Sequence, residues 1–278
     1  MQAPQNHQSI GAILARATTR LGNRLEAEIL LSWALGRSRA WLYAHSDESC
    51  DARQQQSFEN LLAKRVNGVP VAYLTEQRAF HDYLFRVTPD VLVPRPETEL
   101  LIETALQADV PATARVLDIG TGSGCIAITL ALQRPDWRVL ATDVSGPALT
   151  VARHNRDRLD ATVELLEGDL FEPVSERSFH LIVSNPPYIA AGDAHLDQPE
   201  LRHEPELALV AGVDGLDLIR RIVERTPKHL EPGGWLMLEH GHDQAASVRS
   251  LLESSGFNRV GSCRDLAGVE RVSFGKAS

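Results

Sequence analysis

Short apolar runs alternate with stretches of helical periodicity through the second half of the chain, and this alternation constrains the fold most strongly. Several runs end at a Gly, an Asp or an Asn-Pro pair, as buried strands do. A helix between two strands returns the chain parallel to the first strand, so we expect a mostly parallel sheet covered on both faces. The expected strands are 116–119, 138–142, 163–167, 179–184, 235–238, 259–263 and 269–274. The sequence therefore predicts an α/β domain built on a seven-stranded sheet.

The N-terminal part of the chain shows helical spacing only. A second helix is expected over 24–35, where Gly36 ends it, and a third over 52–66. The first helix is marked by apolar residues at helical spacing: Ile10, Ile13, Leu14, Ala17 and Leu21. This small helical domain carries no polar constellation of its own. It is either a packing appendage or a platform for a partner, and the sequence favours neither.

Between these two parts, apolar and polar residues alternate in the way that is typical of a β-hairpin. Its turn is expected at 88–90, where Thr-Pro-Asp separates two apolar segments. The prolines on both sides of Arg95 then hold that residue extended before a helix through Leu106 begins. Pairing of Arg95 with an acid of the α/β domain is the favoured interpretation, and contact with a ligand is the alternative.

The length and composition fit one large domain and a small one. The chain has 278 residues, of which 43% are hydrophobic and 23% charged. We divide it into a helical domain over 1–76, a hairpin linker over 77–98 and an α/β domain over 99–278. No apolar run reaches the roughly 18 residues that span a bilayer. The polar segment 1–9 lacks the features of a signal peptide, so we expect no membrane association and a cytoplasmic location.

Charge and cysteine content narrow the classes of partner and site. The net charge is −9, and residues 1–78 carry +2 of it, which leaves −11 on the remainder. An acidic larger domain argues against a mainly electrostatic grip on nucleic acid, and we expect no stable nucleic-acid binding. Three widely spaced cysteines argue against disulfides and a zinc site. His240 and His242 have no third ligand at a sensible spacing, so we interpret them as structural or solvent-facing and expect no metal.

The tetrapeptide Asn185, Pro186, Pro187 and Tyr188 follows the expected strand 179–184 directly. Ligands of parallel α/β sheets bind at the carboxyl ends of the strands. The two prolines remove two N–H donors, Asn185 and the Pro186 carbonyl add acceptors, and Tyr188 adds a flat ring. This combination suits a planar NH2 group that donates two hydrogen bonds, although Asn-Pro also opens ordinary turns.

A glycine-rich turn follows the first strand of the α/β domain. Gly120, Gly122 and Gly124 are spaced G-x-G-x-G, and Asp143 lies 19 residues after Gly124, at the end of the next strand. Such a turn lets a ligand approach the backbone, and such an acid can bind a ribose diol, as in nicotinamide enzymes. Asp118 just before the turn disfavours a pyrophosphate and favours an amino or sulfonium cation beside it.

These motifs resemble those of the class I S-adenosylmethionine-dependent methyltransferases, which have a Rossmann-like fold. The resemblance implies S-adenosylmethionine as cofactor and S-adenosylhomocysteine as product. It implies that Asp143 holds the ribose and that Asp169 with Leu170 holds the adenine, although Asp169 also fits a plain Gly-Asp turn. Glu239, at the end of a later strand, is a further candidate to face the substrate. The expected cofactor residues are Gly120, Thr121, Gly122, Ser123, Gly124, Asp143, Asp169, Leu170 and Asn185.

Asn-Pro-Pro-Tyr is shared by methyltransferases that act on adenine amino groups and on glutamine amides. The whole chain, with its helical domain, its hairpin, Pro-Arg-Pro-Glu-Thr-Glu over 94–99 and Glu-His-Gly over 239–241, resembles the release factor glutamine methyltransferases (PrmC or HemK). That resemblance implies methylation of the glutamine amide in the Gly-Gly-Gln motif of class 1 peptide chain release factors, with the tetrapeptide as the catalytic residues. It also implies a monomer whose helical domain helps to dock the release factor. Leu170 departs from relatives with an aromatic residue there, which bears on adenine stacking.

Two alternatives remain open at this point. An amino-group methyltransferase acting on adenine in DNA or an exocyclic amine in RNA would need a basic groove and a base-flipping module. A binding module that has lost catalysis would be expected to have lost part of the glycine turn, Asp143 or the tetrapeptide, and all three are intact.

Overall fold

The computed structural model describes residues 8–278, so most of the polar segment from which no signal peptide was expected lies outside the described residues. The chain divides into two compact units. The smaller comprises 8–76 together with Asp197–His203, and the larger comprises Gln77–Leu196 and Glu204–Ser278. Over residues 8–278, no helix combines the length and the apolar character that crossing a bilayer requires.

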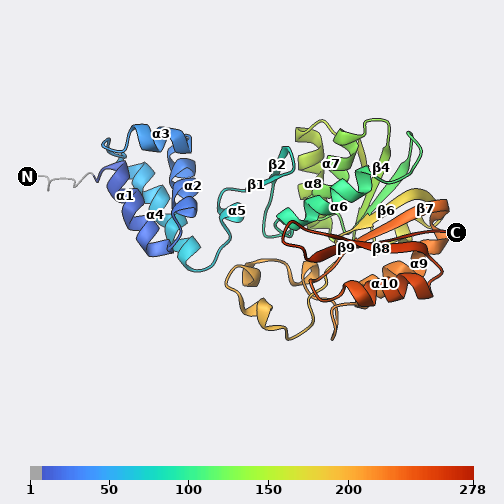
Figure 1. Cartoon of the computed structure of the whole chain (residues 1–278). Coiled ribbons are helices and arrows are strands. Elements are labelled where there is room, and N and C mark those ends of the chain that lie inside the picture. The colour runs from blue at the N-terminus through green and yellow to red at the C-terminus, as the bar shows by residue number, and fades with distance from the viewer. Residues whose placement is uncertain (1–7) are drawn as a thin grey trace, which may run out of the picture. The chain divides into compact units, whose positions relative to one another are not determined.

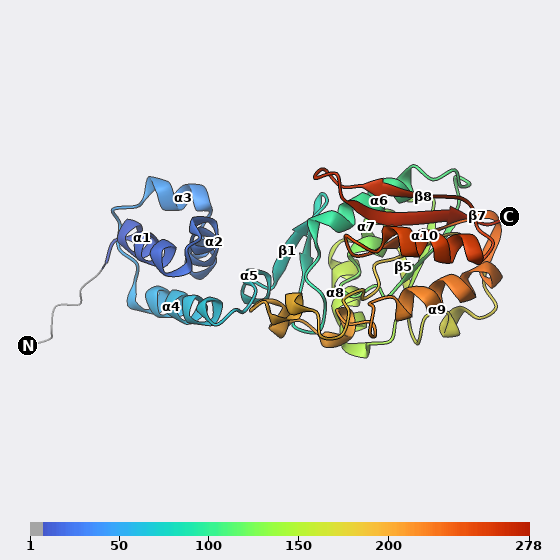
Figure 2. The same cartoon turned by 60° about the horizontal axis from the view of Figure 1, so that its bottom comes forward.

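The smaller unit is a cluster of helices around an apolar core (Figure 2). Ser9, Asn23 and Asp51 cap the N-termini of three of these helices with their side chains, while Gly22 and Gly36 end two of them in the left-handed conformation. The expected helices over 24–35 and 52–66 are confirmed, whereas α3 was not predicted. The helices are α1 (Ile10–Leu21), α2 (Arg24–Leu35), α3 (Arg39–Ala44), α4 (Ala52–Val66) and α5 (Val71–Leu74).

One buried acid of this unit, Glu28 on α2, is held by three neighbours. Its side chain is 2% exposed and accepts hydrogen bonds from Arg24 at 2.9 Å, from Arg39 at 2.7 Å and from the Tyr43 hydroxyl. The Tyr43 hydroxyl, with the two arginines, lowers the pKa of Glu28 to about 2 although burial opposes the shift.

The β-hairpin of the larger unit is real, but its expected turn at 88–90 is wrong. Strands β1 (Gln77–Phe80) and β2 (Tyr83–Arg86) pair antiparallel, and Phe80 opposite Tyr83 closes a two-residue turn at His81 and Asp82. The His81 N–H donates to Glu99 at 2.9 Å, which stabilises this turn from a distant part of the chain. Residues 87–95 form no strand; a 3-10 turn (Pro96–Thr98) and α6 (Glu99–Leu106) follow them.

The predicted seven-stranded sheet is confirmed. Its strand order is β5-β4-β3-β6-β7-β9-β8; β9 pairs antiparallel with both β7 and β8, and the other neighbouring strands pair parallel. The expected strand 235–238 is longer in the structure and begins at Leu230, and its register against the neighbouring strand shifts between Phe179 and Leu181. The strands are β3 (Arg115–Ile119), β4 (Arg138–Asp143), β5 (Val163–Glu167), β6 (Phe179–Ser184), β7 (Leu230–Glu239), β8 (Asn258–Arg264) and β9 (Glu270–Lys276).

Helices cover both faces of the sheet, and alternate strand residues fill two apolar cores (Figure 1). With α6, helices α7 (Cys125–Gln133) and α8 (Gly146–Arg158) cover one face, while α9 (Asp217–Arg225) and α10 (Ala245–Ser254) cover the other. Further 3-10 turns lie at Glu172–Val174, Ala194–Asp197, Leu201–His203, Glu206–Ala208 and Thr226–Lys228.

The strand register decides which loops meet. Strand β3 pairs parallel with both β4 and β6, and Ile119 lies opposite Thr142 on one side and Ser184 on the other. The glycine turn after β3, Asp143 at the end of β4 and Asn185 after β6 therefore emerge at one edge of the sheet. This is the point where the strand order reverses direction, the usual ligand site of such sheets.

Candidate active site

A cavity of about 280 Å³ opens at this carboxyl edge. It brings together residues that follow four different strands and adds the segment before α6 and the 3-10 turn at 206–208. Of the residues expected from the sequence, Gly124 and Tyr188 do not line it. Those that do are Gly120, Thr121, Gly122, Ser123, Asp143, Asp169, Leu170, Asn185, Pro186 and Pro187.

The glycine turn leaves room for a guest where side chains would otherwise lie. Gly120 and Gly122 have φ of +72° and +56°, and a Cβ on either would meet no protein atom within 4 Å. Gly124 has a different role, because a Cβ there would come within 2.7 Å of the Ile128 side chain and 3.3 Å of Ala152 on α8. Gly124 thus permits close packing of the helices rather than access to the cavity.

Asp118 anchors the glycine turn from beneath. Its Oδ2 accepts from the Thr121 hydroxyl at 2.6 Å and from the Ala127 N–H at 3.3 Å. The residue is fully buried, and burial raises its pKa to about 7. Asp118 does not line the cavity, and its place beside a bound cation stays a prediction.

Asp143 links the ends of β3 and β4. Its two carboxylate oxygens accept from the Gly122 N–H at 2.8 Å and from the Ser145 N–H at 2.9 Å, while burial raises its pKa. A carboxylate oxygen can accept more than one hydrogen bond, so a diol in the cavity can still donate to Asp143.

The Gly-Asp-Leu segment after β5 forms another wall of the cavity. The Asp169 carboxylate pairs with Arg221 of α9, a partner that the sequence did not reveal. Leu170 has a φ of +52°, and its carbonyl accepts from the Thr142 hydroxyl at 3.0 Å. Its side chain is 6% exposed and packs in the apolar core, with an edge on the cavity.

Asn185 lines the cavity and carries an unpartnered acceptor. Its Nδ2 donates to the Thr98 hydroxyl at 3.1 Å, whereas its buried Oδ1 has no hydrogen-bond partner among residues 8–278. Leaving a buried polar atom unsatisfied costs roughly 1–3 kcal/mol, so such an atom at a cavity wall marks the place of a donor from a guest.

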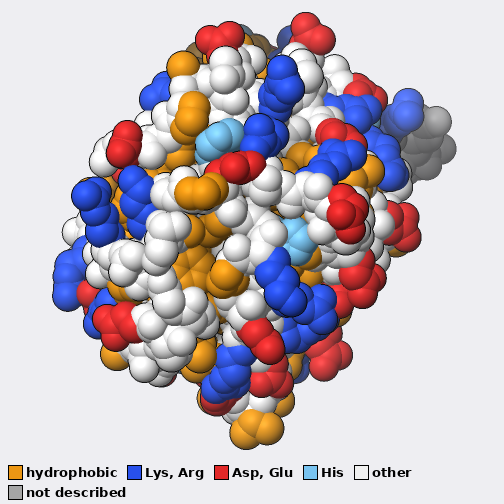
Figure 3. Space-filling model, turned by 90° about the vertical axis from the view of Figure 1, so that its right-hand side faces the viewer, with side chains coloured by type: hydrophobic (Ala, Val, Ile, Leu, Met, Phe, Trp, Pro, Cys, Tyr) orange, Lys and Arg blue, Asp and Glu red, His pale blue; other side chains and the backbone are white. Residues whose placement is uncertain are grey.

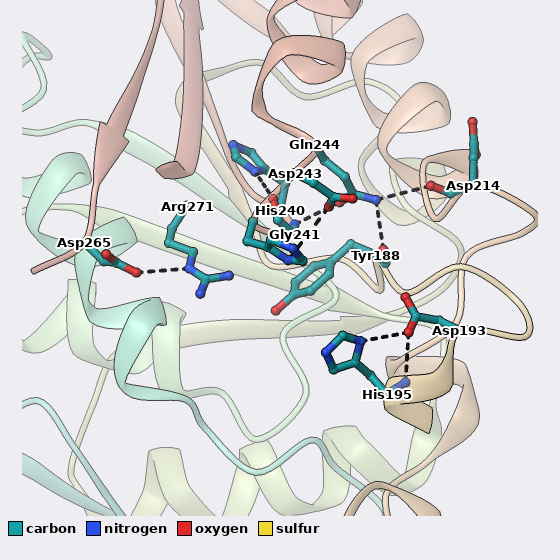
Figure 4. A network of polar contacts seen from close by, with 11 residues as sticks. Tyr188, Asp193, His195, Asp214, His240, Gly241, Asp243, Gln244, Asp265 and Arg271 are labelled. Atoms are coloured by element: carbon teal, nitrogen blue, oxygen red, sulfur yellow. Dashed lines mark hydrogen bonds and ion pairs between the residues drawn. The ribbon is translucent and has the colours of Figure 1, made fainter. Parts of the chain in front are cut away.

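The Tyr188 side chain is partly buried and packs against the apolar core, and the residue does not line the cavity. Its carbonyl accepts from Gln244 Nε2 at 3.0 Å, and the same Gln244 accepts from the Gly241 N–H at 2.8 Å (Figure 4). In that view the Tyr188 hydroxyl points to the side on which Arg271 lies. Burial raises the pKa of the Tyr188 hydroxyl, so it stays protonated at neutral pH. Gln244 thus holds the main chain of Tyr188, and packing against the apolar core holds its ring.

Arg95 pairs with Glu204, an acid of the larger unit, as the favoured interpretation had it. The Glu204 side chain is fully buried and also accepts from the Val93 N–H at 3.1 Å. Glu204 comes 109 residues after Arg95, and no sequence signal pointed to it. Together they attach the loop after β6 to the segment that precedes α6, where both flank the cavity.

His240 and His242 lie in different surroundings, the first buried and the second exposed. His240 is fully buried, with its ring nitrogens bonded to Ser273 Oγ at 2.8 Å and to the Gly241 carbonyl at 2.9 Å. His242 is exposed beside Asp243. On the face drawn in Figure 3, acidic and basic side chains are interspersed, and that face carries no continuous basic stripe among the described residues.

Comparison with known proteins agrees with this geometry. The family model described as "Methyltransferase small domain" matches residues 96–200, and "PrmC N-terminal domain" matches 12–75. A solved methyltransferase from Pyrococcus furiosus shares the fold, with a TM-score of 0.53 and 20% identity over 69% of this chain and 87% of that one. The protein is a methyltransferase of the α/β class with a seven-stranded sheet.

Curated relatives define the family more narrowly. Release factor glutamine methyltransferase of Bordetella pertussis is 50% identical over 91% of this chain and 94% of the relative. The enzyme of the same name from Xylella fastidiosa is 47% identical over 95% of this chain and 97% of the relative. The chain belongs to the release factor glutamine methyltransferase family, and the resemblance inferred from its motifs is confirmed.

Proposed function

We propose that this protein transfers a methyl group from S-adenosylmethionine to the side-chain amide nitrogen of the glutamine in the Gly-Gly-Gln motif of class 1 release factors. Membership of the family supports the reaction. The single observation that carries the site assignment is that Asn185, a residue of the same cavity as the glycine turn, has a buried and unpartnered Oδ1.

The residues present fit the cofactor. The open space at Gly120 and Gly122 admits a ligand against the backbone, Asp143 can accept from ribose hydroxyls, and Asp169 with Leu170 borders the position of the base. The cofactor, when bound, supplies an electrophilic methyl group on a sulfonium and leaves as S-adenosylhomocysteine.

Asn185 and Pro186 then act by positioning. An amide nitrogen is a poor nucleophile because resonance, which holds a rotational barrier of roughly 18–20 kcal/mol, delocalises its lone pair. Two hydrogen bonds of about 0.5–1.5 kcal/mol each cannot remove that resonance. Asn185 Oδ1 and the Pro186 carbonyl each accept one N–H of the substrate amide, which fixes the nitrogen toward the methyl, and such positioning contributes roughly 7–11 kcal/mol. The displaced proton passes to solvent after the new C–N bond forms.

The partner is accordingly a protein, bound transiently by one copy of this chain in the cytoplasm, where translation terminates. We propose that the helical domain contributes to docking. The alternative, an amino-group methyltransferase for DNA or RNA, has less support because the curated relatives are named for release factor glutamine, and because a net charge of −9 disfavours an electrostatic grip on nucleic acid.

Mass spectrometry of a purified class 1 release factor, incubated with this protein and S-adenosylmethionine, tests the proposal. We expect a gain of one methyl group on the factor, and no gain on a matched factor whose Gly-Gly-Gln glutamine is alanine. Methylation of DNA or RNA, with both factors unchanged, would move the assignment to the alternative.

A further inference from the structure

One part of the cavity wall comes from segments that are far apart in the chain. The Gly-Asp-Leu segment after β5 contributes Asp169 and Leu170, the 3-10 turn after Pro205 contributes Leu207, and α9 contributes Arg221. Among residues 8–278, no aromatic side chain lines the cavity. A base bound there has no ring to stack on, so its recognition depends on its polar edge. Of these four residues, only Asp169 and Arg221 are charged, and they form an ion pair.

Helix α9 carries two neighbouring arginines with different partners. Arg221 lines the cavity, as does Leu218 three residues earlier on the same face of the helix. Arg220 does not line the cavity, and its guanidinium pairs with Asp214 and Asp217. Both arginine side chains are 43% exposed, so they differ in their partners and not in their exposure. Only Arg221 is therefore placed to act on a ligand.

The ion pair leaves one oxygen of Asp169 for a guest. The main chain around Asp169 is fixed, because its carbonyl accepts from the Glu172 N–H at 3.0 Å and the Leu170 carbonyl accepts from the Thr142 hydroxyl at 3.0 Å. Asp169 Oδ2 accepts from Arg221 Nη2, whereas Oδ1 has no hydrogen-bond partner among residues 8–278. Because the planar guanidinium holds one oxygen, the other remains available to a donor in the cavity.

Adenine has a donor that fits this acceptor, since its 6-amino group donates N–H, whereas a 6-oxopurine presents a carbonyl oxygen at the same place. We propose that Arg221 is a positioning residue, which holds Asp169 as the acceptor of the 6-amino group and so makes the site select a 6-aminopurine cofactor over its 6-oxo analogue. The proposal rests on the proposed use of S-adenosylmethionine. A partly exposed ion pair contributes little to stability, so the orientation of Asp169, and not the fold, depends on Arg221.

Calorimetric titration with S-adenosylhomocysteine and with S-inosylhomocysteine, which carries an oxygen in place of the 6-amino group, measures this selection. We expect wild type to prefer the amino form by about tenfold or more, as a hydrogen bond to a charged group provides. Arg221→Met should lower the affinity for the amino form about three- to tenfold and leave that for the oxo form nearly unchanged. Arg221→Lys keeps the charge without the planar fork and should recover part of the preference. Arg220→Met, the matched control, should keep the wild-type preference.

Asp169→Asn tests the orientation itself. The new amide has one oxygen and one NH2 group, and Arg221, which can only donate, takes the oxygen. The NH2 group is then left to face the base, where it suits the oxo form, so we expect this variant to prefer S-inosylhomocysteine. Adding Arg221→Met frees the amide to turn, and the preference should move back toward the amino form.

The outcomes separate this inference from the proposed function. An equal preference in wild type and Arg221→Met would overturn it. An equal loss of affinity for both ligands would also overturn it, because Arg221 would then cover the base without selecting its edge. The expected selection in a wild type that fails to methylate a release factor would support the role of Arg221 and reject the proposed substrate alone. A wild type that does not bind S-adenosylhomocysteine would overturn both.

Discussion

At the scale of single residues, three buried polar atoms near the carboxyl edge have no hydrogen-bond partner in the described chain. They belong to Asp118, Asn185 and Glu239. Two of these residues are acids whose pKa burial raises to about 7, so protonation can reduce the cost of burying them. Asn185 is always neutral and has no such relief, and it alone of the three lines the cavity. Its oxygen is the atom that a substrate donor would satisfy.

Asn185→Ala should abolish methyl transfer and leave cofactor binding measurable. The substitution removes the acceptor for the substrate amide but leaves the glycine turn and Asp143 in place. We expect loss of at least about 100-fold in kcat, the range seen when one positioned hydrogen-bonding group is removed from an active site. Single-turnover assays and calorimetry with S-adenosylmethionine measure the two effects separately. Near-normal turnover would remove Asn185 from the mechanism, and Asn60→Ala, on the exposed face of α4, is the control.

At the scale of elements, the turn after β3 is built from glycines in conformations that other residues rarely adopt. Gly122→Ala combines two effects, because its φ of +56° strains an alanine and its Cβ would enter the cavity. Gly22→Ala, at the end of α1, has a similar φ of +66° and an open surrounding, but lies away from the cavity. Both variants should lose about 1–2 kcal/mol of stability.

Only Gly122→Ala should also weaken binding of S-adenosylmethionine, by about tenfold or more, since the added methyl occupies the ligand's place against the backbone. Calorimetric titration of the two variants separates strain from obstruction. Equal affinity in Gly122→Ala and Gly22→Ala would mean that the cofactor does not approach this turn.

The elements differ in how far local sequence determines them. Strands 163–167 and 179–184 and the helix 52–66 were predicted to the residue, because apolar periodicity and turn residues act locally. The hairpin turn was misplaced since Thr-Pro-Asp is the stronger local signal, whereas the real turn is held by Glu99. The bulge in β7 likewise follows from pairing with β6.

The candidate site shows the same division. The glycine turn, Asp143 and Asn185 were identified from their places after strands, and parallel pairing brings them together. Their partners were not visible in the sequence. Thr98, Glu204 and Arg221 come from distant loops and helices, and only packing decides which side chain meets which. Side-chain direction is equally non-local: Tyr188, which was expected to cover a guest, is partly buried against the apolar core and does not line the cavity.

At the scale of the whole molecule, each unit contains a buried glutamate, and folding shifts the pKa values of these two residues in opposite directions. Glu28 has its pKa lowered from 4.5 to about 2, chiefly by the Tyr43 hydroxyl, so the folded chain favours its ionised form. Glu239 has its pKa raised from 4.5 to about 7 by burial, so the folded chain favours its protonated form. Burial likewise raises the pKa of Asp118 to about 7, so the folded chain also favours the protonated form of this residue.

The pH dependence of stability should therefore have two separable arms. Glu28 contributes stability above pH 4.5 that is lost as the pH falls toward 2, because the unfolded chain binds the proton first. Glu239 contributes stability below pH 4.5 that is lost as the pH rises through 7, because the unfolded chain ionises first. Thermal unfolding from pH 3 to 8 should show Glu28→Gln less stable than wild type at pH 7, with the gap narrowing in acid.

The Tm of Glu239→Gln should instead rise relative to that of wild type as the pH increases from 4.5 to 7. Adding Asp118→Asn in a double variant should enlarge this difference in Tm. The reason is that each neutral side chain avoids the cost of burying a charge, which the wild-type residues meet at neutral pH. A wild-type Tm that runs parallel to that of Glu239→Gln across this range would mean that Glu239 is ionised without penalty. Its negative charge would then be compensated by Arg271 and by the hydroxyl groups of Thr98 and Tyr188, which favour the ionised form of Glu239.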